Sequence, residues 1–107
     1  MGDTIDTPAG SLGIDDLLAD KRDEILRLAE KHGAYNVRVF GSVARGEAAE
    51  DSDVDFLVDF SPGYTLWDRI GIIQDLRDLL GRDVDVVAEK NLRKYVRPHI
   101  IQDAVPL

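Results

Sequence analysis

The first regular pattern in the chain is an apolar repeat between residues 14 and 32. Its spacings of three, four and seven involve Ile14, Leu17, Leu18, Ile25, Leu28 and Ala29. This periodicity predicts one amphipathic helix, and Gly33 predicts its end. Residues 1–12 are small and polar, and we interpret them as a flexible lead-in to a single domain at 13–107.

Three short segments alternate or cluster their apolar residues as strands do. The segments are 37–40, 54–60 and 84–87, and the second is the clearest. One face of it carries Val54, Phe56, Val58 and Phe60, while the other carries Asp53, Asp55, Leu57 and Asp59. The sequence therefore predicts a sheet with an apolar face and an aspartate face.

Two further helices are predicted after residue 60. Residues 66–80 keep apolar positions at helical spacing, and Gly81 favours the end of that helix. A last helix is expected between residues 92 and 104, but Pro98 falls inside it. The helix either begins near Pro98 or is kinked there.

The order of these elements predicts an α/β (α+β) fold: helix, strand, strand, helix, strand, helix. Two strands follow one another directly, and their connection at 47–52 is short, which suggests a small mixed sheet. We expect helices to cover the apolar face of the sheet and the aspartates to lie on the other face.

Length and composition indicate one ordinary globular domain. The chain has 107 residues, of which 44% are apolar, and no cysteine. The absence of cysteine excludes disulfides and thiolate metal sites and fits a cytoplasmic location. We see no secretory signal and no apolar run near the ~20 residues that span a bilayer, so no membrane role is expected.

The net charge of −8 argues against direct nucleic-acid binding, because a phosphate backbone is held by clusters of Lys and Arg. Two interpretations of the acidity stay open. It can be a solvated surface, or it can steer the chain toward a basic protein partner.

Asp53 and Asp55 form a candidate metal site. Residues two apart on a strand point the same way, with Cα atoms roughly 6–7 Å apart. Two carboxylates at that span can share divalent ions, and Asp85, in the third strand, can complete the oxygen ligands that Mg²⁺ prefers. Asp59 shares the face but lies about 13 Å from Asp55 along the strand, so we interpret it as a solvated strand end. On spacing alone, a water-facing strand surface explains Asp53 and Asp55 equally well.

The segment Gly41-Ser42-Val43-Ala44-Arg45-Gly46 favours the metal site. It follows a strand and can open a helical turn, an arrangement that cradles phosphate. It is not a Walker A loop, because Glu47-Ala48 replace the required Lys-Ser/Thr. A phosphate cradle beside a carboxylate cluster implies a nucleoside triphosphate bound through Mg²⁺.

This segment, followed six residues later by Ser52-Asp53-Val54-Asp55, resembles the Gly-Ser-x-x-Arg-Gly…Ser-Asp-x-Asp signature of polymerase-β-like nucleotidyltransferases. More narrowly, the chain is similar to the minimal nucleotidyltransferase (MNT) antitoxins from about residue 35 to 105. The resemblance implies Asp53, Asp55 and Asp85 as ligands of two Mg²⁺ ions, with Asp85 as the base or the holder of the nucleophile's metal. It places Gly41 and Ser42 on the nucleotide phosphates. Arg45 either reaches a phosphate or braces the turn by pairing with a carboxylate.

The resemblance also implies a function and a partner. Members of the group pair with a HEPN-domain RNase toxin and neutralise it by transferring AMP from ATP to a toxin tyrosine. We therefore expect an enzyme that forms a hetero-oligomer with its toxin. The alternatives are a non-catalytic antitoxin that acts by occlusion and a small-molecule nucleotidyltransferase.

The remaining chemically distinctive side chains fit structural roles. His32 and His99 are far from the acidic motif in sequence, and we interpret both as helix-end or surface residues. Tyr35, Tyr64 and Tyr95 are potential acceptors of AMP in self-modification, but we expect packing or surface roles for them. For Trp67 we expect either a core or a partner-interface role.

Overall fold

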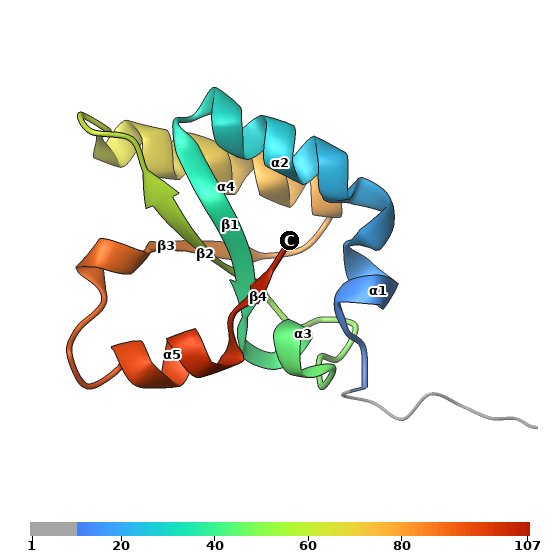
Figure 1. Ribbon diagram of the computed structural model, residues 1–107. Coiled ribbons are helices and arrows are strands. Elements are labelled where there is room, and N and C mark those ends of the chain that lie inside the picture. Colours follow the sequence, from blue (N-terminus) through green and yellow to red (C-terminus); the bar gives the residue numbers. More distant parts are fainter. Residues whose placement is uncertain (1–10) are drawn as a thin grey trace, which may run out of the picture.

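A computed structural model describes residues 11–107 as a four-stranded mixed sheet with helices on both faces (Figure 1). The strands are β1 (Ala34–Phe40), β2 (Val54–Phe60), β3 (Val84–Ala88) and β4 (Val105–Pro106), and they lie in the order β3-β2-β1-β4. β1 is antiparallel to β2 and β4, whereas β2 and β3 are parallel. The predicted α+β class and mixed sheet are confirmed.

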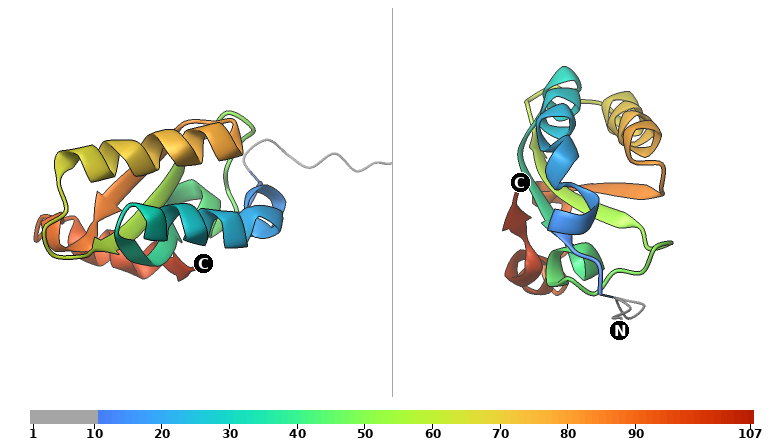
Figure 2. Two further views of the ribbon diagram at one scale, coloured as in Figure 1. Left: turned by 90° about the horizontal axis from the view of Figure 1, so that it is seen from above. Right: turned by 90° about the vertical axis from the view of Figure 1, so that its right-hand side faces the viewer.

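The apolar face of the sheet is covered by α2 (Arg22–Lys31) and α4 (Leu66–Leu80), which contact each other (Figure 2). Val54, Phe56 and Val58 of β2 are fully buried on this side, as their alternation predicts. The opposite face is not fully open, because α5 (Arg97–Asp103) packs against β1 there. Leu57, on the aspartate face, is also fully buried.

The helix predicted over residues 14–32 is broken into three pieces, so that prediction is wrong in its middle. The pieces are α1 (Ile14–Leu17), the short 3₁₀ helix η1 (Ala19–Lys21) and α2. Leu12 pairs with Ala48, which ties the start of α1 to the loop after the motif turn. α2, in contrast, packs along β1. The break at the buried Leu18 allows α1 to stay beside that loop while α2 lies on the sheet.

The start of the chain departs from the predicted lead-in at its last residues. Residues 1–10 of the predicted 1–12 segment lie outside the described part. Leu12 exchanges two backbone hydrogen bonds with Ala48, at 2.8 and 2.9 Å, and packs against the core. The folded unit therefore includes Leu12.

α4 begins and ends where the sequence predicts. The Thr65 backbone N–H donates to Asp68 Oδ2 (2.8 Å) at its start, and Gly81, with φ +67°, ends it. His32 bonds Asp75 at 2.6 Å and so ties the end of α2 to α4. The long crossover helix between β2 and β3 is thus fixed at both ends and along its length.

The C-terminal part resolves the question posed by Pro98. After β3 comes a 3₁₀ turn, η2 (Glu89–Asn91), which the sequence did not predict, and then α5 starts at Arg97 with Pro98 in its first turn. β4, also unpredicted, adds a short strand beside β1, and the Leu107 N–H donates to the Val37 carbonyl (3.0 Å). No helix within residues 11–107 has the length and apolar character to cross a membrane.

Candidate active site

The motif turn forms the short helix α3 (Gly41–Arg45) directly after β1. Gly41 has φ +76°, a conformation that side chains disfavour, and Gly46 ends the helix in the left-handed region. A Cβ at position 41 would stand 2.5 Å from Asp55 Oδ2. Both the backbone conformation and the close approach of Asp55 therefore require glycine at position 41. The predicted turn is confirmed.

Sheet register brings the turn and two aspartates together. Phe40, the last residue before the turn, pairs with Asp55, and Asp55 pairs across β2–β3 with Asp85. Asp53 comes just before β2, where the next residue, Val54, donates its N–H to the Asp83 carbonyl (3.0 Å). The antiparallel and parallel pairings of β2 thus gather residues that lie more than forty positions apart.

The pKa of Asp55 reflects its burial and the carboxylates close to it. Its pKa is raised above the ordinary value, mainly by burial and then by the negative charges of Asp85 and Asp53. Arg45 opposes this with a smaller lowering effect. A divalent cation would relieve the unfavourable ionisation of Asp55 beside these two carboxylates.

Asp85 is held by a neighbour that sequence reasoning missed. Its Oδ1 accepts hydrogen bonds from the Val86 N–H (3.0 Å) and from Arg69 Nη2 (3.2 Å). Arg69 Nε also donates to the Val86 carbonyl (2.8 Å). Arg69 reaches these groups from α4 across the free edge of β3, and no signal in the sequence pairs positions 69 and 85.

The three aspartates fit Mg²⁺ by chemistry, although they are not yet gathered as a closed ligand set. No group of three or more His, Cys, Asp or Glu side chains within residues 11–107 is already placed to hold a metal ion. Carboxylate oxygens are nevertheless the donors that Mg²⁺ prefers. Asp85 Oδ1 accepts both of its hydrogen bonds, and one of them comes from the cationic side chain of Arg69. Arg69 therefore supplies positive charge to a carboxylate that a metal ion would otherwise neutralise.

Arg45 braces the turn in this structure. Its guanidinium bonds Glu47 at 3.1 Å and Asp103 of α5 at 2.6 Å. The Glu47 N–H also donates to the Ser42 carbonyl (2.9 Å), which closes the end of α3. Of the two roles left open by the sequence, the bracing role is the one these contacts support.

Ser52, the residue before the aspartates, holds the approach to β2. Its hydroxyl accepts the Ala49 N–H (2.8 Å), and its carbonyl accepts Arg82 Nη1 (3.1 Å). Both bonds are internal to the protein, so Ser52 shapes the loop that delivers Asp53.

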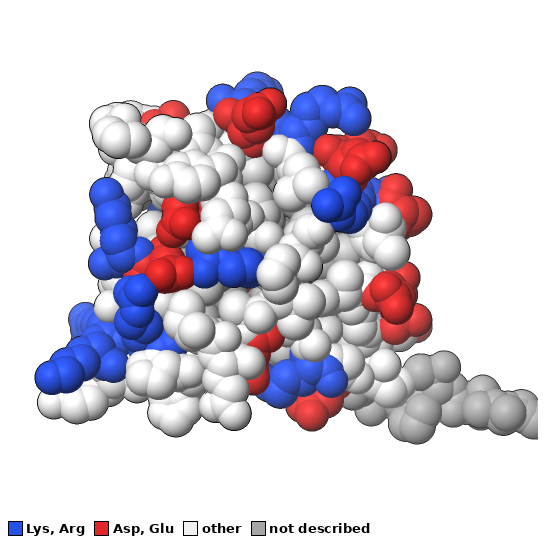
Figure 3. Space-filling model, in the orientation of Figure 1, with Lys and Arg blue, Asp and Glu red and all other residues white. Residues whose placement is uncertain are grey.

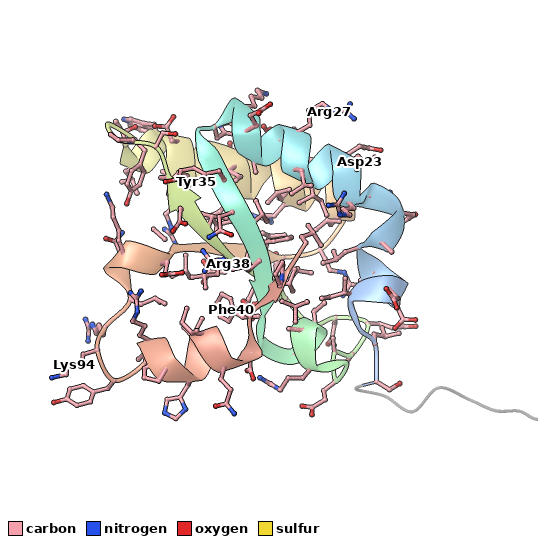
Figure 4. The ribbon with its side chains drawn as sticks, in the orientation of Figure 1. Asp23, Arg27, Tyr35, Arg38, Phe40 and Lys94 are labelled. Atoms are coloured by element: carbon pink, nitrogen blue, oxygen red, sulfur yellow. The ribbon has the colours of Figure 1, made fainter. Side chains whose placement is uncertain are left out.

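A charged cluster also lies on the aspartate face. Arg38, mostly buried on β1, pairs with Glu89 and lies 3.6 Å from Asp59, while Arg97 bonds Glu89 at 2.7 Å. Arg38 lowers the pKa of Glu89. Asp59 lies at the end of β2 and is partly exposed, as predicted, but it also accepts a hydrogen bond from Asn36 Nδ2 (3.0 Å), so water is not its only partner. Figure 4 shows Arg38 and Phe40 on β1 above α5. The pairing of Arg38 with Glu89 of η2 and of Arg97 with the same carboxylate joins distant parts of the chain, so no local pattern in the sequence predicts this cluster.

The other side chains considered from sequence lie apart from the aspartates. His32 is a helix-end residue bonded to Asp75, and His99 is exposed on α5. Tyr64 stacks on Phe60 with ring centroids 4.3 Å apart. Trp67 is 76% exposed, so of its two proposed roles the core role is wrong.

Known proteins are similar to this chain in sequence and in fold. The family described as "Nucleotidyltransferase domain" matches residues 22–106. Protein adenylyltransferase MntA of Thermococcus cleftensis is 41% identical over 78 residues, which cover 73% of this chain and 79% of that protein. A solved minimal nucleotidyltransferase structure has 46% identity and a TM-score of 0.79, covering 90% of this chain and 97% of that chain.

A more distant structure shares the fold. It is the complex of a tri-AMPylated HEPN toxin of Shewanella oneidensis with an MNT antitoxin. The match has a TM-score of 0.61 and 19% identity, and it covers 78% of this chain and 66% of the matched chain.

Proposed function

Because this chain belongs to the nucleotidyltransferase domain family, we propose that it transfers AMP from ATP to a hydroxyl group of a partner protein in a Mg²⁺-dependent reaction. The observation that carries this proposal is the register Phe40–Asp55–Asp85, which sets two carboxylates beside a positive-φ glycine turn. The adenylyltransferase name of the Thermococcus relative supports AMP as the transferred group.

The metal role of the aspartates rests on charge and donor type. Asp53, Asp55 and Asp85 would hold Mg²⁺, two ions being the arrangement that the family resemblance implies. When bound, Mg²⁺ lowers the pKa of a hydroxyl nucleophile and offsets the charge of the triphosphate. The raised pKa of Asp55 supports this role, because burial and two neighbouring carboxylates leave it in need of a cation.

The chain's own groups would orient the substrates. The backbone of Gly41 and Ser42 would bind the phosphates of ATP, while Arg45 keeps that turn fixed to α5. The acceptor oxygen attacks the α-phosphorus and forms a new P–O ester bond. The bond from that phosphorus to the bridging oxygen breaks, and pyrophosphate leaves. Asp85 would take the hydroxyl proton as the base or would hold the nucleophile's metal, the two roles that the family resemblance implies.

The acceptor we propose is a tyrosine of a cognate HEPN-domain RNase toxin, with which the chain would form a hetero-oligomer in the cytoplasm. Two observations support an external protein acceptor. The motif resemblance is to antitoxins of this kind, and the Shewanella complex, similar in fold, contains an AMPylated HEPN toxin. AMP transfer to that tyrosine would neutralise the RNase.

The proposal is tested by incubating the chain with ATP labelled at the α-phosphate, Mg²⁺ and the HEPN protein encoded beside it. We expect label on a toxin tyrosine, located by mass spectrometry, and loss of both label and neutralisation in the Asp53→Ala/Asp55→Ala variant. Neutralisation without label, surviving in that variant, would instead establish a non-catalytic antitoxin. Partner-free labelling of a small alcohol or an aminoglycoside would establish a small-molecule enzyme.

A further inference from the structure

A cleft of about 620 Å³ lies at the free edge of β3, outside the carboxylate site. The first residues of α4 and the residues before it form one wall, with Tyr64, Leu66 and Arg69. The end of β3 and η2 form the other, with Lys90 and Asn91. We refer to the space lined by these five residues as the β3-edge cleft.

The aromatic wall of this cleft is fixed before anything binds. Tyr64 is stacked on Phe60, and its hydroxyl accepts a hydrogen bond from Asn91 Nδ2 (3.0 Å). Lys90 Nζ lies 5.0 Å from the Tyr64 ring centroid. A ligand would therefore meet a preformed surface and would lose little free energy in ordering it.

Arg69 connects the cleft to the reaction centre. The side chain lines the cleft, and its guanidinium bonds both Asp85 Oδ1 and the Val86 carbonyl. A segment seated in the cleft would thus lie next to a residue that holds one of the proposed metal ligands. This adjacency is what an acceptor protein needs in order to present a hydroxyl to the site.

An exposed tryptophan extends this surface beyond the cleft. Leu66, which lines the cleft, is 64% exposed, and the next residue, Trp67, is 76% exposed; both lie in the first turn of α4. That turn is ordered, since the Thr65 N–H is capped by Asp68. Tryptophan is enriched among residues that dominate protein interfaces, so an ordered, exposed Leu-Trp pair favours contact with a protein over a small molecule.

Unpaired positive charge flanks the other wall. Residues 90–102 contain Lys90, Arg93, Lys94 and Arg97 but no Asp or Glu, in a chain of net charge −8. Arg97 pairs with Glu89. Lys90, Arg93 and Lys94 make no ion pair with any residue between 11 and 107. Figure 3 shows Lys and Arg side chains gathered at the corner where Figure 4 labels Lys94.

We propose that the β3-edge cleft and the exposed Leu66–Trp67 pair bind an acidic segment of the acceptor protein, one that carries a large apolar side chain. The apolar side chain would pack on Leu66 and Trp67, and carboxylates would face Lys90, Arg93 and Lys94. The proposal rests on the proposed function in one respect, that the bound protein is the acceptor of AMP. Charge complementarity identifies the segment as acidic.

The test uses the full chain and the HEPN protein encoded beside it, with two surface variants and a matched control. Trp67→Ala removes the apolar contact, and Lys94→Glu reverses one unpaired charge. Arg27→Glu is the control, because Arg27 is an exposed cation on α2, is not among the residues that line the cleft, and makes no ion pair with any residue between 11 and 107. Binding is measured by calorimetry, and Mg²⁺·AMP-PNP binding by thermal shift reports on the carboxylate site.

We expect Trp67→Ala to raise the Kd for the partner about 30-fold. Lys94→Glu should raise it about fivefold at low salt and less at high salt, because salt screens exposed charges. Arg27→Glu should leave the Kd unchanged, and all three variants should bind Mg²⁺·AMP-PNP as the wild type does.

Three outcomes would overturn the docking proposal. In one, Trp67→Ala and Lys94→Glu bind the partner as tightly as the wild type and label it with the same KM. In another, Trp67→Ala disrupts a homodimer seen by gel filtration while the Kd for the partner stays fixed, so that a second copy occupies the surface. In the third, the wild type does not bind the HEPN protein. By contrast, tight, Trp67-dependent binding without labelling would sink the AMP-transfer proposal and leave the docking surface standing.

Discussion

The backbone of Gly41 lies directly against the carboxylate of Asp55, so that a Cβ at position 41 would stand 2.5 Å from Asp55 Oδ2. Gly41 begins α3 directly after β1, and its φ of +76° lets the chain turn there, beside Asp55 near the start of the neighbouring strand β2. The phosphate turn and the central carboxylate are therefore a single packed unit.

Gly41→Ala should disable this unit. The new methyl group would push the Asp55 carboxylate away and strain the backbone, so we expect at least ~100-fold loss of transfer activity and about 1–3 kcal/mol of lost stability. The matched control is Gly63→Ala, at φ +88° with nothing within 4 Å of the added Cβ. It should cost about 1 kcal/mol and keep full activity. Urea unfolding and labelled-ATP assays measure both, and equal activity in the two variants would contradict the argument.

Asp55→Asn should separate stability from activity. Because the pKa of Asp55 is raised in the folded chain, the folded state holds this proton more tightly than the unfolded state does. Its contribution to the free energy of unfolding is full below the ordinary pKa near 4 and is lost as pH rises through the raised value. Metal-free Asp55→Asn should lose less stability than the wild type between pH 4 and 7, yet transfer no AMP.

The same variant should also respond less to metal. Mg²⁺ should raise the melting temperature of the wild type at pH 7, because a cation offsets the crowded carboxylates. Asp55→Asn should show a clearly smaller rise. An identical Mg²⁺ response in the two proteins would remove Asp55 from the metal site.

Arg45→Ala and Asp103→Ala should resemble one another. If Arg45 acts by fixing α3 to α5, losing either partner loosens the turn by the same route. We expect each variant to lower activity by a similar factor, on the order of tenfold, with the double variant little worse. A much larger rise in the KM for ATP in Arg45→Ala than in Asp103→Ala would instead mean that Arg45 contacts a phosphate.

Arg69→Ala should lower the Mg²⁺ concentration that gives half-maximal activity, by roughly 3–10-fold, because it removes a positive charge that competes for Asp85. Arg69→Lys keeps the charge and should stay closer to the wild type. Mg²⁺ titrations of thermal shift and of labelling check this. A higher Mg²⁺ requirement in Arg69→Ala would mean that Arg69 chiefly positions the carboxylate.

Asp75→Asn should weaken the contact between α2 and α4 in a pH-dependent way. The hydrogen bond from His32, aided by Lys31, lowers the pKa of Asp75 below its ordinary 3.8. The stabilisation is therefore present above the ordinary pKa and disappears as pH falls through the lowered one. Since the pair is partly exposed, we expect about 0.5 kcal/mol at pH 7. Asp23→Asn, in an exposed pair with Arg22, should change nothing measurable.

The sequence was informative wherever a local rule decides the structure. The alternation at 54–60, and the helical spacing at 66–80 followed by Gly81, predict β2 and α4 at their observed bounds, because periodicity and a terminating glycine are local properties. The Gly41–Gly46 turn is predicted for the same reason. Pro98 left two alternatives, and the one that places it in the first turn of α5 is confirmed.

Contacts that cross the fold could not be read from the pattern. The break at Leu18 depends on the pairing of Leu12 with Ala48, and β4 exists only because the chain end returns to β1. Arg69 reaches Asp85 across a strand edge. Averaging charge over the whole chain also concealed a basic stretch at 90–102, since the net value of −8 describes no part of the surface in particular.

The continuity of β1, α3 and β2 bears on how the chain acquires its site during folding. Residues 34–60 hold the glycine turn, Asp53 and Asp55 in one antiparallel unit, whose contacts are close in sequence. Asp85 joins them only after the chain has crossed over through α4 and added β3 in parallel. Local pairing precedes such long-range parallel pairing because it closes a shorter loop. The glycine turn, Asp53 and Asp55 would therefore come together early in folding. The site would become able to catalyse the reaction only later, when β3 adds Asp85.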